Sequence, residues 1–119
     1  MAVDEGLVAW VEEAMEPVGT VTRRAMMGGA TLYCEGTIFA IISMDALWFK
    51  ADAVSDAEWD AAGCVRFRYE IGEGRVGTMN YRRAPDDVYD DGDEMRRWAT
   101  LALAAGARAP VKKTKVRKS

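Results

Sequence analysis

The stretch from Arg23 to Lys50, RRAMMGGATLYCEGTIFAIISMDALWFK, decides the fold class. It is rich in Thr, Ile, Tyr, Phe and Trp, the residue types that favour strands, and it is broken at Gly28-Gly29, Glu35-Gly36 and Ser43-Met44-Asp45. Runs of strand-forming residues separated by turn residues predict a meander of short antiparallel strands.

One segment of this meander is apolar at every position from Ile38 to Ile42. Because side chains alternate along a strand, Ile38, Ala40 and Ile42 should share one face and Phe39 and Ile41 the other. Apolar residues on both faces predict a central strand that is covered on both sides.

Helical patterns flank the meander. Before it, apolar residues recur near the 3.6-residue period from about residue 4 to 16, with acidic residues at the start and Pro17 at the end. After it, Ser55-Asp56-Ala57-Glu58 fits a capping box, in which the serine hydroxyl accepts a hydrogen bond from the amide of Glu58. A short second helix should follow, bury Trp59 and end at Gly63.

The rest of the chain completes the pattern. Strands are expected over residues 65–71 and 77–82, and a last helix over about 93–106, ending at Gly106. Its inward residues should be Met95, Trp98, Ala99, Ala102 and Ala105. The order of helices and strands predicts an α+β fold, in which helices pack on an antiparallel sheet.

Charge divides the chain into two parts. The net charge is -3, yet all the acidic residues precede position 108. We therefore expect an acidic domain over residues 1–107 and a basic tail over 108–119, disordered because it has little apolar surface to bury. The tail either contacts nucleic acid or an acidic partner, or is a solvated segment that folds back on its own domain. Its cations are Arg108, Lys112, Lys113, Lys115, Arg117 and Lys118.

The chain contains no histidine, which excludes Ser-His and Cys-His nucleophile pairs and the commonest zinc ligand. Cys34 and Cys64 are too few for a disulfide framework and are expected to be reduced, part-buried thiols. The N-terminus lacks a signal-peptide pattern, and no apolar run approaches the roughly 20 residues that cross a bilayer. We expect a cytoplasmic protein without membrane contact, metal or cofactor, and not an enzyme.

Two motifs imitate known sites. Residues 72–77, GEGRVG, match the dinucleotide fingerprint G-x-G-x-x-G, but a strand-like run follows where that site needs a helix, so a hairpin loop is predicted. The aspartates between 86 and 93 lack the ligand spacing of a calcium loop and should begin a helix on an acidic surface.

The candidate interaction site is the run around the first predicted turn. Two adjacent arginines enter what should be an edge or first strand, where they either blunt the edge against aggregation or anchor a partner. The double glycine should permit a tight reversal or the close approach of another backbone. The candidate residues are Arg23, Arg24, Met26, Met27, Gly28 and Gly29.

The ordered motifs resemble the N-terminal domain of the TfoX/Sxy competence regulators. The resemblance spans about residues 7 to 106 and departs from the family's usual run at Met27 and Trp48. The matching stretches are Arg24-Ala25-Met26-Met27-Gly28-Gly29, Leu32-Tyr33-Cys34-Glu35-Gly36, Phe39-Ala40-Ile41-Ile42, Leu47-Trp48-Phe49-Lys50-Ala51-Asp52, Phe67-Arg68-Tyr69-Glu70, Asn80-Tyr81-Arg82-Arg83-Ala84-Pro85 and the helix around Trp98.

The resemblance implies a two-layer, secretion-chaperone-like α+β fold with the order α, three or four strands, α, two strands, α. It also implies a regulatory, non-catalytic role, which in full-length relatives concerns control of DNA uptake and transcription together with a cyclic-AMP receptor protein. Those regulators carry a C-terminal helical domain where this chain has its basic tail, so we expect a stand-alone relative.

The sequence therefore favours a regulatory or protein-interaction domain whose partner is another protein or a second copy in a homodimer. Two alternatives stay open: a nucleic-acid-associated protein that uses the basic tail, and a small-molecule binder or unrecognised enzyme, which would need a buried pocket with ionisable groups of perturbed pKa.

Overall fold

The computed structural model describes residues 4–26, 29–43 and 45–109. The elements are α1 (Glu5–Met15), β1 (Val21–Met26), β2 (Gly29–Cys34), β3 (Thr37–Ser43), β4 (Ala46–Lys50), α2 (Asp56–Ala61), β5 (Arg66–Gly72), β6 (Arg75–Arg83), the short 3-10 helix η1 (Asp86–Tyr89) and α3 (Gly92–Arg108). This order confirms the predicted α+β architecture, with four strands before α2 and two after it.

The strands form one sheet in the order β1-β2-β3-β4-β6-β5, and all neighbouring strands are antiparallel. The meander accounts for β1 to β4. Its turns require left-handed backbone, with positive φ at Glu35, Gly36 and Asp45. The sheet then continues through β6, so that β1 and β5 are its two edges.

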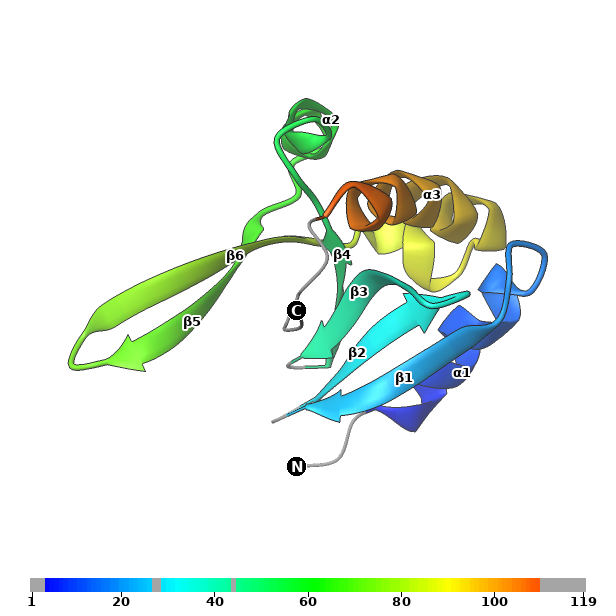
Figure 1. The fold of residues 1–119 in the computed structure, drawn as a ribbon, viewed down its shortest axis with the longest axis horizontal. Coiled ribbons are helices and arrows are strands. Elements are labelled where there is room, and N and C mark those ends of the chain that lie inside the picture. Colours follow the sequence, from blue (N-terminus) through cyan, green and yellow to red (C-terminus); the bar gives the residue numbers. More distant parts are fainter. Residues whose placement is uncertain (1–3, 27–28, 44, 110–119) are drawn as a thin grey trace, which may run out of the picture.

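Helices α1 and α3 pack against each other and cover one face of the sheet (Figure 1). Their apolar stripes, including all five residues predicted for α3, are buried in the main core with one face of β2, β3 and β4. None of the described helices lies on the other face, which is called the helix-free face below. It holds a second, smaller cluster in which Ile41, Trp48, Phe67 and Tyr81 are buried.

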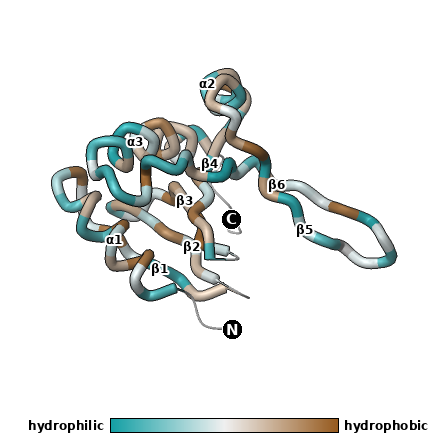
Figure 2. Tube along the Cα trace, turned by 180° about the vertical axis from the view of Figure 1, so that it is seen from behind, coloured by the Kyte–Doolittle hydropathy of each residue, from teal (hydrophilic) through white to brown (hydrophobic). Residues whose placement is uncertain are grey.

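The β5–β6 hairpin extends from this body as an arm (Figure 1). Figure 2 shows that the arm is hydrophilic at its turn but carries a hydrophobic segment close to it, and that other hydrophobic segments lie around β2 and β3. The motif GEGRVG contains the turn, with positive φ at Gly72, Glu73 and Gly74. This confirms the predicted hairpin loop.

The predicted side-chain alternation of the central strand is wrong in part. Residues 39–42 are buried and β3 is central, as expected. However, Ile38 joins the cluster on the helix-free face with Ile41, while Phe39 joins the main core with Ala40 and Ile42. The cause is a register shift where β3 passes Leu32 and Tyr33 of β2, since one extra residue in a strand reverses the alternation.

The predicted capping box is also wrong. Ser55 lies at the N-cap of α2, but its hydroxyl does not cap the helix. It donates instead to Asp52, 3.1 Å from Oδ1, and accepts from the Asp52 amide. The buried serine thus closes the loop between β4 and α2.

Gly106 does not end the last helix, which continues to Arg108. A Cβ at this position would lie 2.0 Å from the carbonyl oxygen of Ile38. Glycine is required here because α3 and β3 approach backbone to backbone, and not because the helix terminates.

Candidate functional site

Arg23, Arg24 and Met26 of the predicted contact site lie on β1, an edge of the sheet. From Thr22 to Ala25 this strand is exposed. The two arginines point to opposite faces, because neighbouring side chains alternate along a strand. Arg23 Nη1 lies 2.9 Å from Glu5 Oε1 of α1, on the helix-covered face. Arg24 therefore lies on the helix-free face, where it has no ion pair with any described residue.

Two other candidate residues lie at the end of β1 and the start of β2. Met26 is half-buried beside the cluster of the helix-free face, and its Sδ accepts a hydrogen bond from Thr31 Oγ1. Gly29 begins β2, and a Cβ there would lie 1.8 Å from the Ile42 carbonyl oxygen, which confirms a close backbone approach. Met27 and Gly28 lie outside the described residues.

The sheet and the helices differ in charge. The strands carry eight cationic side chains, although the whole chain has a net charge of -3. Among the strand residues that the structure describes, Glu70 is the one carboxylate. The acidic residues are thus concentrated in helices and loops, and the strand cations are Arg23, Arg24, Lys50, Arg66, Arg68, Arg75, Arg82 and Arg83.

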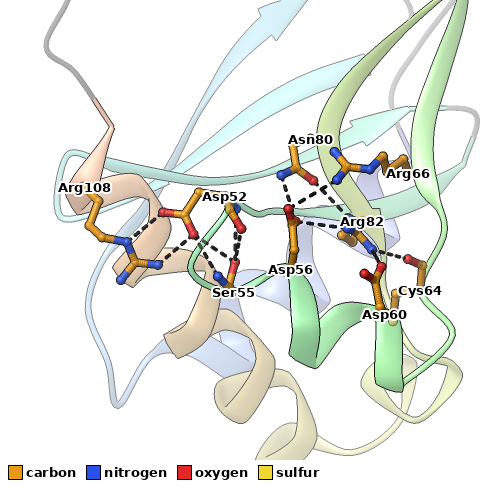
Figure 3. Close-up of polar contacts among 9 residues, drawn as sticks. All are labelled: Asp52, Ser55, Asp56, Asp60, Cys64, Arg66, Asn80, Arg82 and Arg108. Carbon is orange, nitrogen blue, oxygen red and sulfur yellow. Dashed lines mark hydrogen bonds and ion pairs between the residues drawn. The ribbon is translucent and has the colours of Figure 1, made fainter.

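One of these cations is buried. Arg82 of β6 is 2% exposed, and its guanidinium donates to four acceptors. Nη1 lies 2.7 Å from Asp60 Oδ1 and 2.9 Å from the Cys64 carbonyl oxygen, and Nη2 lies 3.0 Å from Asp56 Oδ1. Nε donates to Asn80 Oδ1 (Figure 3). A planar guanidinium suits this arrangement because its donors are fixed in one plane.

Asp56 is the acceptor at which this network meets. Burial opposes its ionisation, but the hydrogen bond from Asn80 and the charges of Arg66 and Arg82 outweigh that effect and lower the pKa of Asp56. Arg66 lies 3.3 Å from its second oxygen. The carboxylate is therefore ionised at neutral pH and joins α2 to β5 and β6.

Chemically, the network is suited to holding α2 on the sheet. A shallow depression of about 440 Å³ lies beside it, lined by Arg66, Arg68 and Thr78 as well as Arg82. Cys64 also lines it, and burial raises the pKa of this thiol more than Arg82 lowers it, so the thiol stays protonated. Within the part of the chain that the structure describes, no three His, Cys, Asp or Glu side chains are grouped as metal ligands.

The first cation of the predicted tail belongs to the folded domain. Arg108 ends α3 and forms two hydrogen bonds with Asp52, Nε 2.7 Å from Oδ2 and Nη2 2.8 Å from Oδ1. The bond from Arg108 lowers the pKa of Asp52 well below its usual range. The prediction of a disordered tail is thus wrong for Arg108, while Lys112, Lys113, Lys115, Arg117 and Lys118 lie outside the described residues.

The sequence did not reveal the Arg82 network. Asn80 and Arg82 lie in a predicted strand that carries no functional motif, and nothing in the sequence distinguishes buried Arg82 from exposed Arg83. The nearest signal is the two-residue spacing of Asn80 and Arg82, which places both on one face of a strand.

None of the described helices combines the length and apolar character needed to span a bilayer.

The sequence is similar to known proteins over most of its folded region. The TfoX N-terminal domain family matches residues 5–106. The DNA transformation protein TfoX1 of Aliivibrio fischeri is 27% identical over 67 residues, which are 56% of this chain and 32% of that protein. The match thus spans about a third of the length of this relative. Because the family match covers nearly all of the folded region, the chain belongs to the TfoX N-terminal domain family.

Proposed function

We propose that this chain is a non-catalytic, cytoplasmic regulatory domain, and that edge strand β1 binds an extended, acidic segment of a protein partner. The relative in A. fischeri is named for DNA transformation. By analogy, this chain takes part in regulating such a process, and it does so by binding another protein.

The observation that carries the proposal is the open, cationic edge of the sheet. Among residues 4–26, 29–43 and 45–109, strand β1 has one neighbour, β2, so the outward row of its backbone N–H and C=O groups can pair with another strand. Arg24 projects from the helix-free face beside this edge, and Lys50 and Arg83 lie on the same face. An acidic segment added to β1 would gain both main-chain hydrogen bonds and a charge partner for Arg24.

These features favour a polypeptide over nucleic acid. A row of backbone donors and acceptors pairs with another peptide strand, whereas a phosphate backbone offers acceptors alone. The chain as a whole also has a net charge of -3, so a long polyanion would be repelled more strongly than a short acidic segment.

Photo-cross-linking tests the proposal. A photoreactive residue replaces Thr22, which is exposed on β1, and in a matched control it replaces Thr100, which is exposed on α3. We expect position 22 to cross-link one discrete acidic protein in native cytoplasm, and position 100 not to do so. Adding Arg24→Glu should abolish the cross-link, because the reversed charge repels an acidic segment.

Two outcomes would contradict the proposal. One is equal cross-linking from positions 22 and 100, or persistence of the product in the Arg24→Glu variant. The other is a product that nuclease destroys and that disappears when residues 109–119 are deleted, which would assign function to nucleic-acid binding by the basic tail.

A further inference from the structure

The second open edge of the sheet, β5, lies on the β5–β6 arm (Figure 1). Register shifts occur between Arg66 and Phe67 and between Glu70 and Gly72, so the regular part of this edge runs from Phe67 to Glu70. Arg68, Tyr69 and Glu70 are all exposed there. In the described chain, Arg68 and Glu70 form no ion pair.

The aromatic side chain of this edge leaves the backbone open. Tyr69 pairs with Gly77 of β6, and a Cβ on that glycine would lie 2.7 Å from Cζ of the tyrosine ring. The ring therefore leans over Gly77 of β6 and also stacks on Phe67 of its own strand, with 6.3 Å between centroids, so it does not cover the free side of β5. An exposed edge without proline or a covering side chain can pair with another strand.

The charge pattern of β5 is complementary to itself. When two identical strands pair antiparallel about a two-fold axis, one residue faces its own copy and its neighbours face each other in reverse order. An axis at Phe67 sets Arg66 opposite Arg68, and an axis at Glu70 sets two glutamates together. An axis at Arg68 sets two arginines together, and the Arg66–Glu70 pairs that it would also form use an arginine that lies beyond a register shift and already pairs with Asp56. An axis at Tyr69 sets Arg68 opposite Glu70 twice, with no like-charge pair.

We propose that β5 is a homodimerisation strand, which pairs antiparallel with β5 of a second copy about an axis at Tyr69. The dimer joins the two sheets into one continuous sheet and leaves β1 open at each end. Two Arg68–Glu70 contacts set the register, since like charges directly opposite in a sheet are destabilising and opposite charges are favourable.

Sedimentation equilibrium of the full chain tests this proposal by charge exchange. The wild-type chain should form dimers as its concentration is raised from the low to the high micromolar range. Arg68→Glu and Glu70→Arg should each weaken the dimer by at least about tenfold, because each places two like-charge pairs in the register. An equimolar mixture of the two variants should restore association, since glutamates of one chain then face arginines of the other.

Matched controls carry the same charge changes elsewhere. Arg24→Glu on β1 and Glu73→Arg in the hairpin turn should leave the dimer intact, and far-UV circular dichroism should show all four variants folded. A monomeric wild-type chain, dimers that persist in either β5 variant, or a mixture that fails to associate would overturn the proposal. The Arg24→Glu control also separates this dimer from partner binding at β1.

Discussion

At the scale of single residues, Arg82 has the largest predicted effect on stability. It is buried with carboxylate, amide and carbonyl acceptors around it, so its removal would leave buried or half-buried polar groups without a donor. Asp60 is 68% exposed and can be resolvated, whereas Asp56 is 24% exposed and would lose more. The cost therefore falls mainly on Asp56 and Asn80.

We expect Arg82→Met to lower the free energy of unfolding by about 3 kcal/mol, the low end for breaking a buried ion pair. Arg83→Met is the matched control, because Arg83 is the exposed neighbour and its guanidinium lies 5.7 Å from the Trp48 ring. Its cost should stay within about 1 kcal/mol. Urea unfolding followed by tryptophan fluorescence measures both, and equal costs would contradict the role assigned to Arg82.

The lowered pKa of Asp56 predicts acid sensitivity. A carboxylate whose pKa is lower in the folded than in the unfolded state stabilises the fold above its unfolded pKa, about 3.9, and loses that contribution as pH falls towards the folded pKa. The free energy of unfolding should therefore decrease between about pH 5 and pH 3. The Asp56→Asn variant should be less stable than the wild-type chain at neutral pH, but its free energy of unfolding should fall less between about pH 5 and pH 3. Urea unfolding at several pH values measures this, and the same pH dependence in both proteins would disprove the assignment.

At the scale of elements, the strands of the meander and the apolar stripe of α3 could be predicted because each depends on local sequence. The predictions that were wrong concern features that depend on contacts between distant segments. A bulge against β2 reverses the side-chain alternation of β3, and Ser55 binds Asp52 instead of capping α2. Glycine is needed at position 106 because α3 contacts the backbone of β3 there. Sequence patterns specify a helix or strand, but not the neighbour that shifts its register or requires a glycine.

The packing of α3 on β3 gives an element-scale prediction. Alanine normally stabilises a helix relative to glycine, but Gly106→Ala should lower the free energy of unfolding by about 1–3 kcal/mol, because the new methyl group overlaps the Ile38 carbonyl and forces the helix away. Gly92→Ala, in the first turn of the same helix, meets only the end of the long Arg96 side chain and should raise the free energy of unfolding by between zero and about 1 kcal/mol. Thermal unfolding compares them, and a stabilising Gly106→Ala would refute the close packing.

At the scale of the whole molecule, the sheet is cationic and the helices and loops together are acidic, and in the described part of the chain neither β1 nor β5 has a second neighbouring strand. The sequence indicated the acidic domain and the arginines of β1. It could not indicate the charge separation, because the strand cations come from both halves of the chain and meet through the β4–β6 pairing. The Arg23–Glu5 pair, which leaves Arg24 on the other face, likewise depends on the position of α1.

The proposed addition of a protein strand to β1 should change the protection of the β1 amides. Amide hydrogen exchange of the full chain, measured by mass spectrometry with and without the protein cross-linked from position 22, tests it most directly. We expect slower exchange in peptides covering Val21–Met26 and unchanged exchange in β5 and α3, because a new strand forms hydrogen bonds with the outward-facing β1 amides. Protection confined to α3, to β5 or to residues 109–119, with β1 unchanged, would contradict it.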